Sequence, residues 1–143
     1  MSKKTSNSKI LLVDDEEDIL KMLELSLSDF GYQVTTVLSV DRAIVFLREE
    51  CFDYILSDYA MPGRNGLDLL FHLKKKAPEM IAEGRFAFFS GSSLELQDIA
   101  KREGVPLIEK PLNLEILLNF LSPPSPSELS SRTEKGRLGS RGV

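Results

Sequence analysis

Short apolar segments of strand length alternate with helix-length amphipathic segments, and this alternation constrains the fold more than any other feature of the sequence. The apolar segments are Ile10–Val13, Val34–Val37, Tyr54–Leu56, Phe86–Phe89 and Val105–Ile108. The first and the fourth are apolar throughout, which is typical of parallel strands that are covered on both faces. Such strands need long crossover connections, and the segments between them are long enough to supply them.

The intervening segments show the apolar spacing of three and four residues that indicates a helix. They cover residues 19–30, 40–47, 69–77, 96–100 and 114–121. Gly31 is expected to end the first helix as its C′ residue, Ser39 to cap the second, Pro78 to stop the third and Gly104 to close the fourth. Repeated strand–helix units joined by right-handed crossovers predict an α/β fold, a doubly wound parallel sheet with helices on both faces.

Ligands of such sheets bind beyond the carboxyl ends of the strands, so the residues that follow each strand are the candidates for function. The first strand is followed by an unbroken run of acids, Asp14–Asp18. One or two acids favour the start of a helix by interacting with its dipole. Five crowded carboxylates repel one another, and a divalent cation would relieve that repulsion. Helix capping and cation binding therefore both remain open for this run.

The third strand is followed by Asp58. An aspartate in this position is a common turn residue. The first and third strands are neighbours at the centre of the expected sheet, however, so Asp58 should lie beside Asp14 and Asp15. Three carboxylates at one edge are costly without a metal, and a set of oxygen ligands with no His or Cys favours Mg²⁺ or Mn²⁺.

The fourth and fifth strands are followed by Ser90 and Lys110. Taken alone, each has an ordinary explanation, a helix cap or turn for the serine and a surface charge for the lysine. Together with the acids they make up the parts of a phosphoryl-transfer site, with a carboxylate nucleophile and with a hydroxyl and an ammonium to hold the phosphoryl oxygens. The residues thus predict a Mg²⁺-dependent site that accepts a phosphoryl group on a carboxylate.

At these positions the chain resembles the receiver (REC) domain of two-component response regulators, of the single-domain type. The resemblance rests on KILLVDDE, YILSDYAMPGRNGLDLL, FAFFSGSS and LIEKPLN, which begin at residues 9, 54, 86 and 107. It implies a five-stranded, (βα)5 flavodoxin-like sheet with strand order 2-1-3-4-5 over residues 9–121. It also implies a protein that is no ordinary enzyme and that catalyses only its own phosphorylation and slow dephosphorylation.

The resemblance implies a role for each acid. Asp58 would be the phosphoacceptor, taking a phosphoryl group from a phosphohistidine of a sensor histidine kinase or of a histidine phosphotransfer protein. The metal ligands would be Asp14, Asp15, Asp58 and the backbone carbonyl of Ala60. The cation would be Mg²⁺, or Mn²⁺ in its place.

The resemblance also implies how the signal leaves the site. Ser90 would donate a hydrogen bond from its hydroxyl to the phosphoryl oxygens, and Lys110 would form an ion pair with them. The Lys110–Pro111 peptide bond is expected to be cis and to orient this lysine. Movement of Ser90 would change a surface that binds partners or forms a homodimer in the family. That surface would comprise the helix at 96–100, the strand at 105–108 and the helix at 114–121.

Two alternatives stay open. Relatives place Tyr or Phe three residues before the lysine, where this chain has Leu107, so the usual aromatic switch is in doubt. The chain could therefore be a docking module that works without phosphorylation. Independently of this departure, it could be the receiver part of a longer DNA-binding regulator. A phosphatase of the haloacid-dehalogenase type would need a D-x-D pattern after the first strand, where Asp14, Asp15 and Glu16 stand instead.

The composition of the chain excludes several classes of partner and of covalent structure. Acidic residues outnumber basic ones by nine over residues 10–121, which argues against direct nucleic-acid binding. No apolar run is long enough for a signal peptide or a membrane span, so a cytoplasmic protein with no membrane partner is expected.

The single cysteine, Cys51, excludes an internal disulfide. Residues 1–8 are polar and basic, and residues 122–143 are rich in Ser and Pro, so both ends are expected to be disordered.

Overall fold

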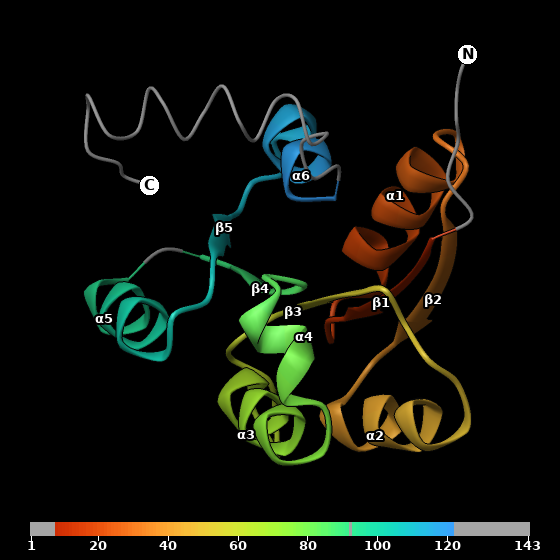
Figure 1. Ribbon diagram of the computed structural model, residues 1–143. Coiled ribbons are helices and arrows are strands. Elements are labelled where there is room, and N and C mark those ends of the chain that lie inside the picture. Colours follow the sequence, from red (N-terminus) through yellow and green to blue (C-terminus); the bar gives the residue numbers. More distant parts are fainter. Residues whose placement is uncertain (1–7, 92, 122–143) are drawn as a thin grey trace, which may run out of the picture. The chain divides into compact units, whose positions relative to one another are not determined.

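The computed structural model describes residues 8–91 and 93–121, and its centre is a five-stranded parallel sheet with the order β2-β1-β3-β4-β5 (Figure 1). The strands are β1 (Lys9–Val13), β2 (Gln33–Val37), β3 (Tyr54–Ser57), β4 (Phe86–Ser90) and β5 (Leu107–Glu109). The doubly wound fold and its strand order are thus confirmed. Disorder was predicted for residues 1–8 and 122–143, and all of these except Ser8 lie outside the described residues.

The chain divides into two units, Met1–Asn113 and Leu114–Val143. The first unit holds α1 (Glu17–Ser28), α2 (Val40–Glu49), α3 (Gly66–Lys76), α4 (Pro78–Ala82) and α5 (Leu94–Glu103). The second unit holds α6 (Leu114–Leu121), at the position predicted from its leucine spacing. In residues 8–91 and 93–121, no helix has both the length and the apolar character that crossing a bilayer requires.

Both faces of the sheet are covered, which explains why β1 and β4 are apolar throughout. Successive side chains of a strand point to opposite faces. Leu11 and Val13 belong to a core cluster with buried side chains of α2, α3 and α5, so Ile10 and Leu12 face the other way. Figure 1 shows α1 on the opposite side of β1 and β2 from α2, and α1 buries its own row of leucines there.

The helix ends predicted at Gly31, Ser39 and Gly104 are confirmed by their local geometry. The Ser39 side chain accepts a hydrogen bond from Arg42 N at 3.1 Å, and Gly104 caps α5 in the left-handed conformation with φ 74°. Gly31, expected as the C′ residue of α1, has a left-handed φ of 92°, and its N–H donates to Ser28 O at 3.0 Å while Tyr32 N donates to Leu27 O at 3.3 Å. These are the two hydrogen bonds of a Schellman motif with a glycine at C′, which follows the regular helix that ends at Ser28.

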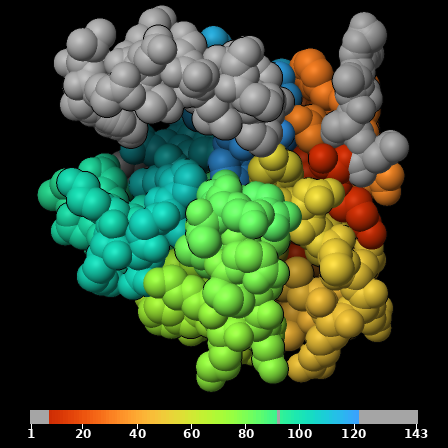
Figure 2. Space-filling model, viewed as in Figure 1, coloured from red at the N-terminus to blue at the C-terminus, as the bar shows by residue number. Residues whose placement is uncertain are grey.

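Helix α4 was not predicted from the sequence. It begins at Pro78, a residue that was expected only to end α3. Pro78 does follow the end of α3, but it also occupies the first turn of α4, where its missing N–H costs nothing. Five residues are too few to show a helical period in sequence. Met80, which is 6% exposed, and the partly buried Ile81 pack against the core, while the other residues of this short helix are exposed (Figure 2, light green).

The last strand begins two residues later than predicted. Val105 N donates to Ala100 O at the end of α5, so it takes no part in the sheet. Pro106 has no N–H to give to a strand ladder, although its carbonyl accepts a hydrogen bond from Phe88 N at 3.0 Å. Val105 is buried after α5 while Pro106 is exposed, and β5 is limited to Leu107–Glu109.

His72 on α3 predicts a pH dependence of stability. Burial lowers the pKa of His72 below its ordinary 6.5, and nearby cations including Lys76 and Arg64 lower it further. The unfolded chain therefore binds the proton more readily, and the folded state loses stability as pH falls through 6.5. Urea unfolding at about pH 7.5 and about pH 5.5 measures this, and the His72→Gln variant should show a smaller drop. An equal drop in both proteins would contradict the assignment to His72.

Candidate functional site

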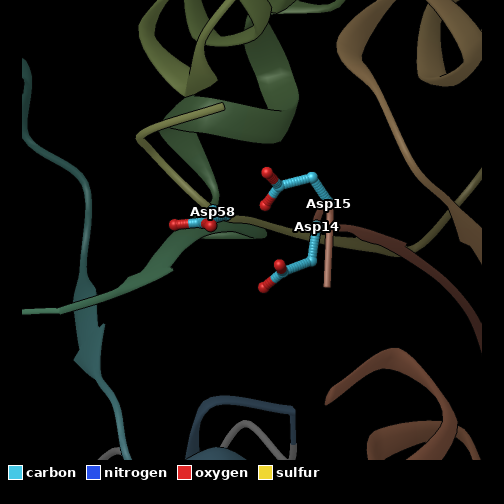
Figure 3. Close-up of side chains that lie close together, drawn as sticks. All are labelled: Asp14, Asp15 and Asp58. Carbon is cyan, nitrogen blue, oxygen red and sulfur yellow. The ribbon is translucent and has the colours of Figure 1, made fainter. Parts of the chain in front are cut away.

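The pairing of β1 with β3 brings the predicted acids together at one edge of the sheet. Val13 lies opposite Ser57, and Asp58 N donates to Val13 O at 2.8 Å, so Asp14 and Asp58 leave neighbouring strands side by side. Figure 3 shows their carboxylates close to that of Asp15. Oxygens from the three groups all lie within 4.8 Å of one another. The expected convergence of Asp14, Asp15 and Asp58 is confirmed.

Asp14 is 2% exposed and is the most deeply buried acid of the cluster. Its Oδ1 accepts a hydrogen bond from Glu16 N at 2.9 Å. Its Oδ2 receives no well-aligned hydrogen bond from the residues that the structure describes, although Lys110 Nζ lies 2.9 Å away as an ion pair. Burial raises the pKa of Asp14 and the charge of Asp58 adds to that rise, while Lys110 opposes it. A buried carboxylate oxygen that is poorly paired in this way fits a hard divalent cation.

Asp58, which is 6% exposed, is held so that its two oxygens face different partners. Its Oδ1 accepts a hydrogen bond from Tyr59 N at 2.8 Å. Its Oδ2 lies 3.4 Å from Lys110 Nζ. The backbone is held as well, because the buried Ser57 hydroxyl donates to the Asp58 carbonyl at 2.8 Å. One carboxylate oxygen is thus oriented by the backbone while the other faces a cation.

Lys110 and Ser90 come from the ends of adjacent strands. Ser90 ends β4 and is 6% exposed, and Lys110 N donates to Ser90 O at 2.9 Å. The Lys110–Pro111 bond is cis, as expected. Lys110 Nζ also lies over the ring of Phe89, 5.4 Å from its centroid. The Lys110 side chain therefore lies at the edge of the sheet, against Phe89, with its ammonium beside the carboxylates of the acidic cluster.

The Lys110 ammonium is shared among three carboxylates. It lies 2.9 Å from Asp14, 3.2 Å from Glu16 and 3.4 Å from Asp58. Burial acts to lower the pKa of Lys110, but these carboxylates outweigh it and the pKa is raised. The lysine therefore stays charged and is positioned to neutralise negative charge that develops at Asp58.

The start of α3 approaches the site closely, and sequence reasoning missed this. Gly66 N donates to Tyr59 O at 2.8 Å, and a Cβ at Gly66 would lie 2.4 Å from the Asp58 carbonyl oxygen. Asn65 and Asp68 form a capping box that begins the helix here, three residues before the predicted start at 69. An Asn-Gly pair with an acid three residues after the Asn is the sequence signal that would have found it.

Two further contacts of Lys110 were also missed. Glu16 was considered only as one of a run of acids, and Phe89 only as part of an apolar strand. No sequence signal distinguishes Glu16 from Glu17, because only the path of the backbone decides which carboxylate reaches the lysine. Ala60, predicted to offer its carbonyl, lies in the loop two residues after Asp58 with its side chain exposed.

Residues 10–122 match the family described as the response regulator receiver domain. The chain belongs to this family. The receiver domain family is not a family of classical enzymes, in agreement with the expectation from sequence. Among its relatives, the alginate biosynthesis transcriptional regulatory protein AlgB of Pseudomonas aeruginosa is 40% identical over 72 residues, which is 50% of this chain and 16% of AlgB. The two-component response regulator ARR14 of Arabidopsis thaliana is 46% identical over 67 residues, 46% of this chain and 18% of ARR14.

Solved receiver domains match over most of their length. The chemotaxis protein CheY4 of Vibrio cholerae is 28% identical with a TM-score of 0.70, over 81% of this chain and 97% of that one. A CheY-like receiver domain protein of Methanospirillum hungatei is 27% identical with a TM-score of 0.72, over 92% of this chain and 100% of that one. This receiver domain thus corresponds to whole CheY-like structures, whereas it spans less than a fifth of the curated relatives.

Proposed function

We propose that this receiver domain is a phosphorylation-dependent signalling module in a two-component phosphorelay. In this proposal Asp58 accepts the phosphoryl group of a phosphohistidine on a sensor histidine kinase or a histidine phosphotransfer protein. One observation carries the proposal: in a chain of the receiver family, a buried aspartate beside two further acids has one oxygen turned toward a charged lysine at 3.4 Å.

Phosphoryl transfer from the phosphohistidine to Asp58 forms one bond to phosphorus and breaks another. Asp58 Oδ2 attacks phosphorus, an O–P bond forms, the P–N bond to the donor imidazole breaks, and the electron pair leaves with that imidazole. Tyr59 N keeps the carboxylate oriented through Oδ1. Lys110 compensates the charge of the phosphoryl oxygens, and the Ser90 hydroxyl donates to one of them. Positioning and electrostatics of this kind account for most of the catalysis in phosphoryl transfer.

The donor set fits Mg²⁺, or Mn²⁺ in its place. Asp14, Asp15 and Asp58 offer carboxylate oxygens within 4.8 Å of one another, and the carbonyl of Ala60 is the further ligand in this proposal. The poorly paired Oδ2 of Asp14 supports the assignment. When bound, the cation would neutralise negative charge on the transferred phosphoryl oxygens.

We propose that the signal leaves through α5 and β5. An aspartyl phosphate adds about one to two negative charges beside Ser90 and Lys110. Ser90 ends β4, the last strand before α5, and Lys110 directly follows β5. Leu107, which packs against the core cluster, stands where the family has its aromatic switch, so the change is carried by the Ser90 loop without that switch. Participation of the helix at 114–121 and dimerisation stay predictions from sequence.

We further propose that residues 9–121 form the receiver and act in the cytoplasm on a protein partner. The excess of acidic residues opposes nucleic acid and anionic membranes as direct partners. A second candidate, the receiver part of a longer DNA-binding regulator, is favoured by the description of AlgB as a transcriptional regulatory protein. The length of the native polypeptide, measured in a cell lysate, separates the two candidates.

The proposed function predicts metal-dependent uptake of one phosphoryl group. Incubation with acetyl phosphate and Mg²⁺ is expected to add the mass of one phosphoryl group to the intact protein. EDTA should prevent the gain and excess Mg²⁺ should restore it, because the crowded carboxylates need a cation. A folded protein that gains no mass with Mg²⁺ would contradict the proposal. The phosphorylation-independent docking module, which Leu107 favours, would then take its place.

A further inference from the structure

Among residues 8–91 and 93–121, Glu16 is the one carboxylate paired with Lys110 that neither the metal nor the phosphoryl group requires. Asp14 and Asp58 belong to the acidic triad, whereas Glu16 does not. Its Oε1 nevertheless lies 3.2 Å from Lys110 Nζ, closer than Asp58 does at 3.4 Å. We propose that Glu16 competes with the phosphoryl group for Lys110 and so lowers the stability of the phosphorylated state. The inference rests on the proposed function and adds a regulating residue to the same site.

The backbone holds Glu16 at the site and leaves its side chain free for the lysine. Glu16 is the N-cap residue of α1, but its side chain makes no capping hydrogen bond. Its N–H donates to Asp14 Oδ1 at 2.9 Å, which ties the backbone to the acidic cluster. The Glu16 side chain is 59% exposed while that of Lys110 is 18% exposed, so the pair lies at the entrance of the site.

Competition follows from what the lysine can offer. An ammonium has three donors, and a phosphoryl group brings three strongly accepting oxygens with about two negative charges. Each hydrogen bond that Lys110 keeps with Glu16 is withheld from the phosphoryl oxygens. The charge of Glu16 also repels the incoming anion. Both effects oppose phosphoryl binding, and neither requires Glu16 to touch the metal.

The test compares Glu16→Gln with Glu17→Gln. Both variants remove one negative charge from adjacent exposed positions at the start of α1, and no ion pair is found between Glu17 and Lys110 in the described part of the chain. Beryllofluoride serves as the phosphoryl mimic, since the DrrB receiver domain, 27% identical, has been solved in a BeF3-activated form. Affinity for Mg²⁺ alone, and then for beryllofluoride at saturating Mg²⁺, is followed through the NMR signal of the Tyr59 amide.

Glu16→Gln is expected to bind beryllofluoride about three- to tenfold more tightly than the wild type, against less than about twofold for Glu17→Gln. Its affinity for Mg²⁺ alone should be unchanged or weaker, because one negative charge is lost. A merely structural defect at the start of α1 would weaken both ligands and lower the unfolding midpoint. Beryllofluoride binding no tighter in Glu16→Gln than in Glu17→Gln overturns the inference. A wild type that neither binds beryllofluoride nor gains a phosphoryl group overturns the proposed function itself.

Discussion

Asp58→Asn is expected to take up no phosphoryl group from acetyl phosphate and Mg²⁺, while its far-UV circular dichroism stays that of the wild type. Asparagine has nearly the same shape and can still accept the Tyr59 N–H through its amide oxygen, so the local backbone is retained. The amide lacks the anionic oxygen that attacks phosphorus. Intact mass spectrometry of both proteins under the same conditions measures the loss.

The matched control is Asp98→Asn, which removes the same charge from an exposed position on α5. It should gain one phosphoryl group as the wild type does. A full gain in Asp58→Asn would show that a different residue is the acceptor, and peptide mapping would then decide between Asp14 and Asp15. Such a result would refute the role assigned to Asp58 but not the membership in the receiver family.

Gly66→Ala is expected to lower the free energy of unfolding by about 2 kcal/mol or more, because overpacking against backbone is costly. The new Cβ would lie 2.4 Å from the Asp58 carbonyl oxygen, 3.0 Å from Tyr59 Cα and 3.1 Å from Phe88 Cε1. Alanine is the better helix former by about 1 kcal/mol, so the steric conflict must exceed that gain. Because the displaced atoms belong to Asp58 and its neighbour, phosphoryl uptake should slow as well. Urea unfolding and the rate of mass gain measure the two effects.

Gly91→Ala is the control for this substitution. Gly91 has open space around its would-be Cβ and an ordinary φ, so its unfolding free energy should change by less than about 0.5 kcal/mol. If Gly66→Ala were as stable as Gly91→Ala, the close approach of α3 to the Asp58 backbone would not constrain the site.

The architecture was predictable because burial on both faces leaves a direct mark on sequence. The strands β1 and β4 are apolar throughout, and Ser39 and Gly104 mark helix ends with local hydrogen bonds and a left-handed φ. The omission of α4 arises where two local rules meet, because Pro78 both follows the end of α3 and begins α4.

The acidic cluster was predictable for a topological reason. Once the first and third strands are neighbours in a parallel sheet, the residues that follow them must meet at one edge, so Asp14, Asp15 and Asp58 could be grouped without coordinates. Lys110 could be placed at the same edge for the same reason. What each side chain contacts could not be predicted, because strand order specifies which edge a residue occupies but not the direction of its side chain.

The sequence by itself determined the alternation of strands and helices and the set of groups at the functional edge, because these depend on periodicity and chain connectivity, while the strand order followed from the resemblance to receiver domains. Only the tertiary structure decided that Glu16 rather than Glu17 reaches Lys110, and that Asp58 turns one oxygen to Tyr59 N and the other to the lysine. It also decided that a glycine is required where α3 begins. These contacts depend on shifts of an ångström or less between groups far apart in the chain, and hydrogen bonds and steric repulsion are sensitive to distances of that size.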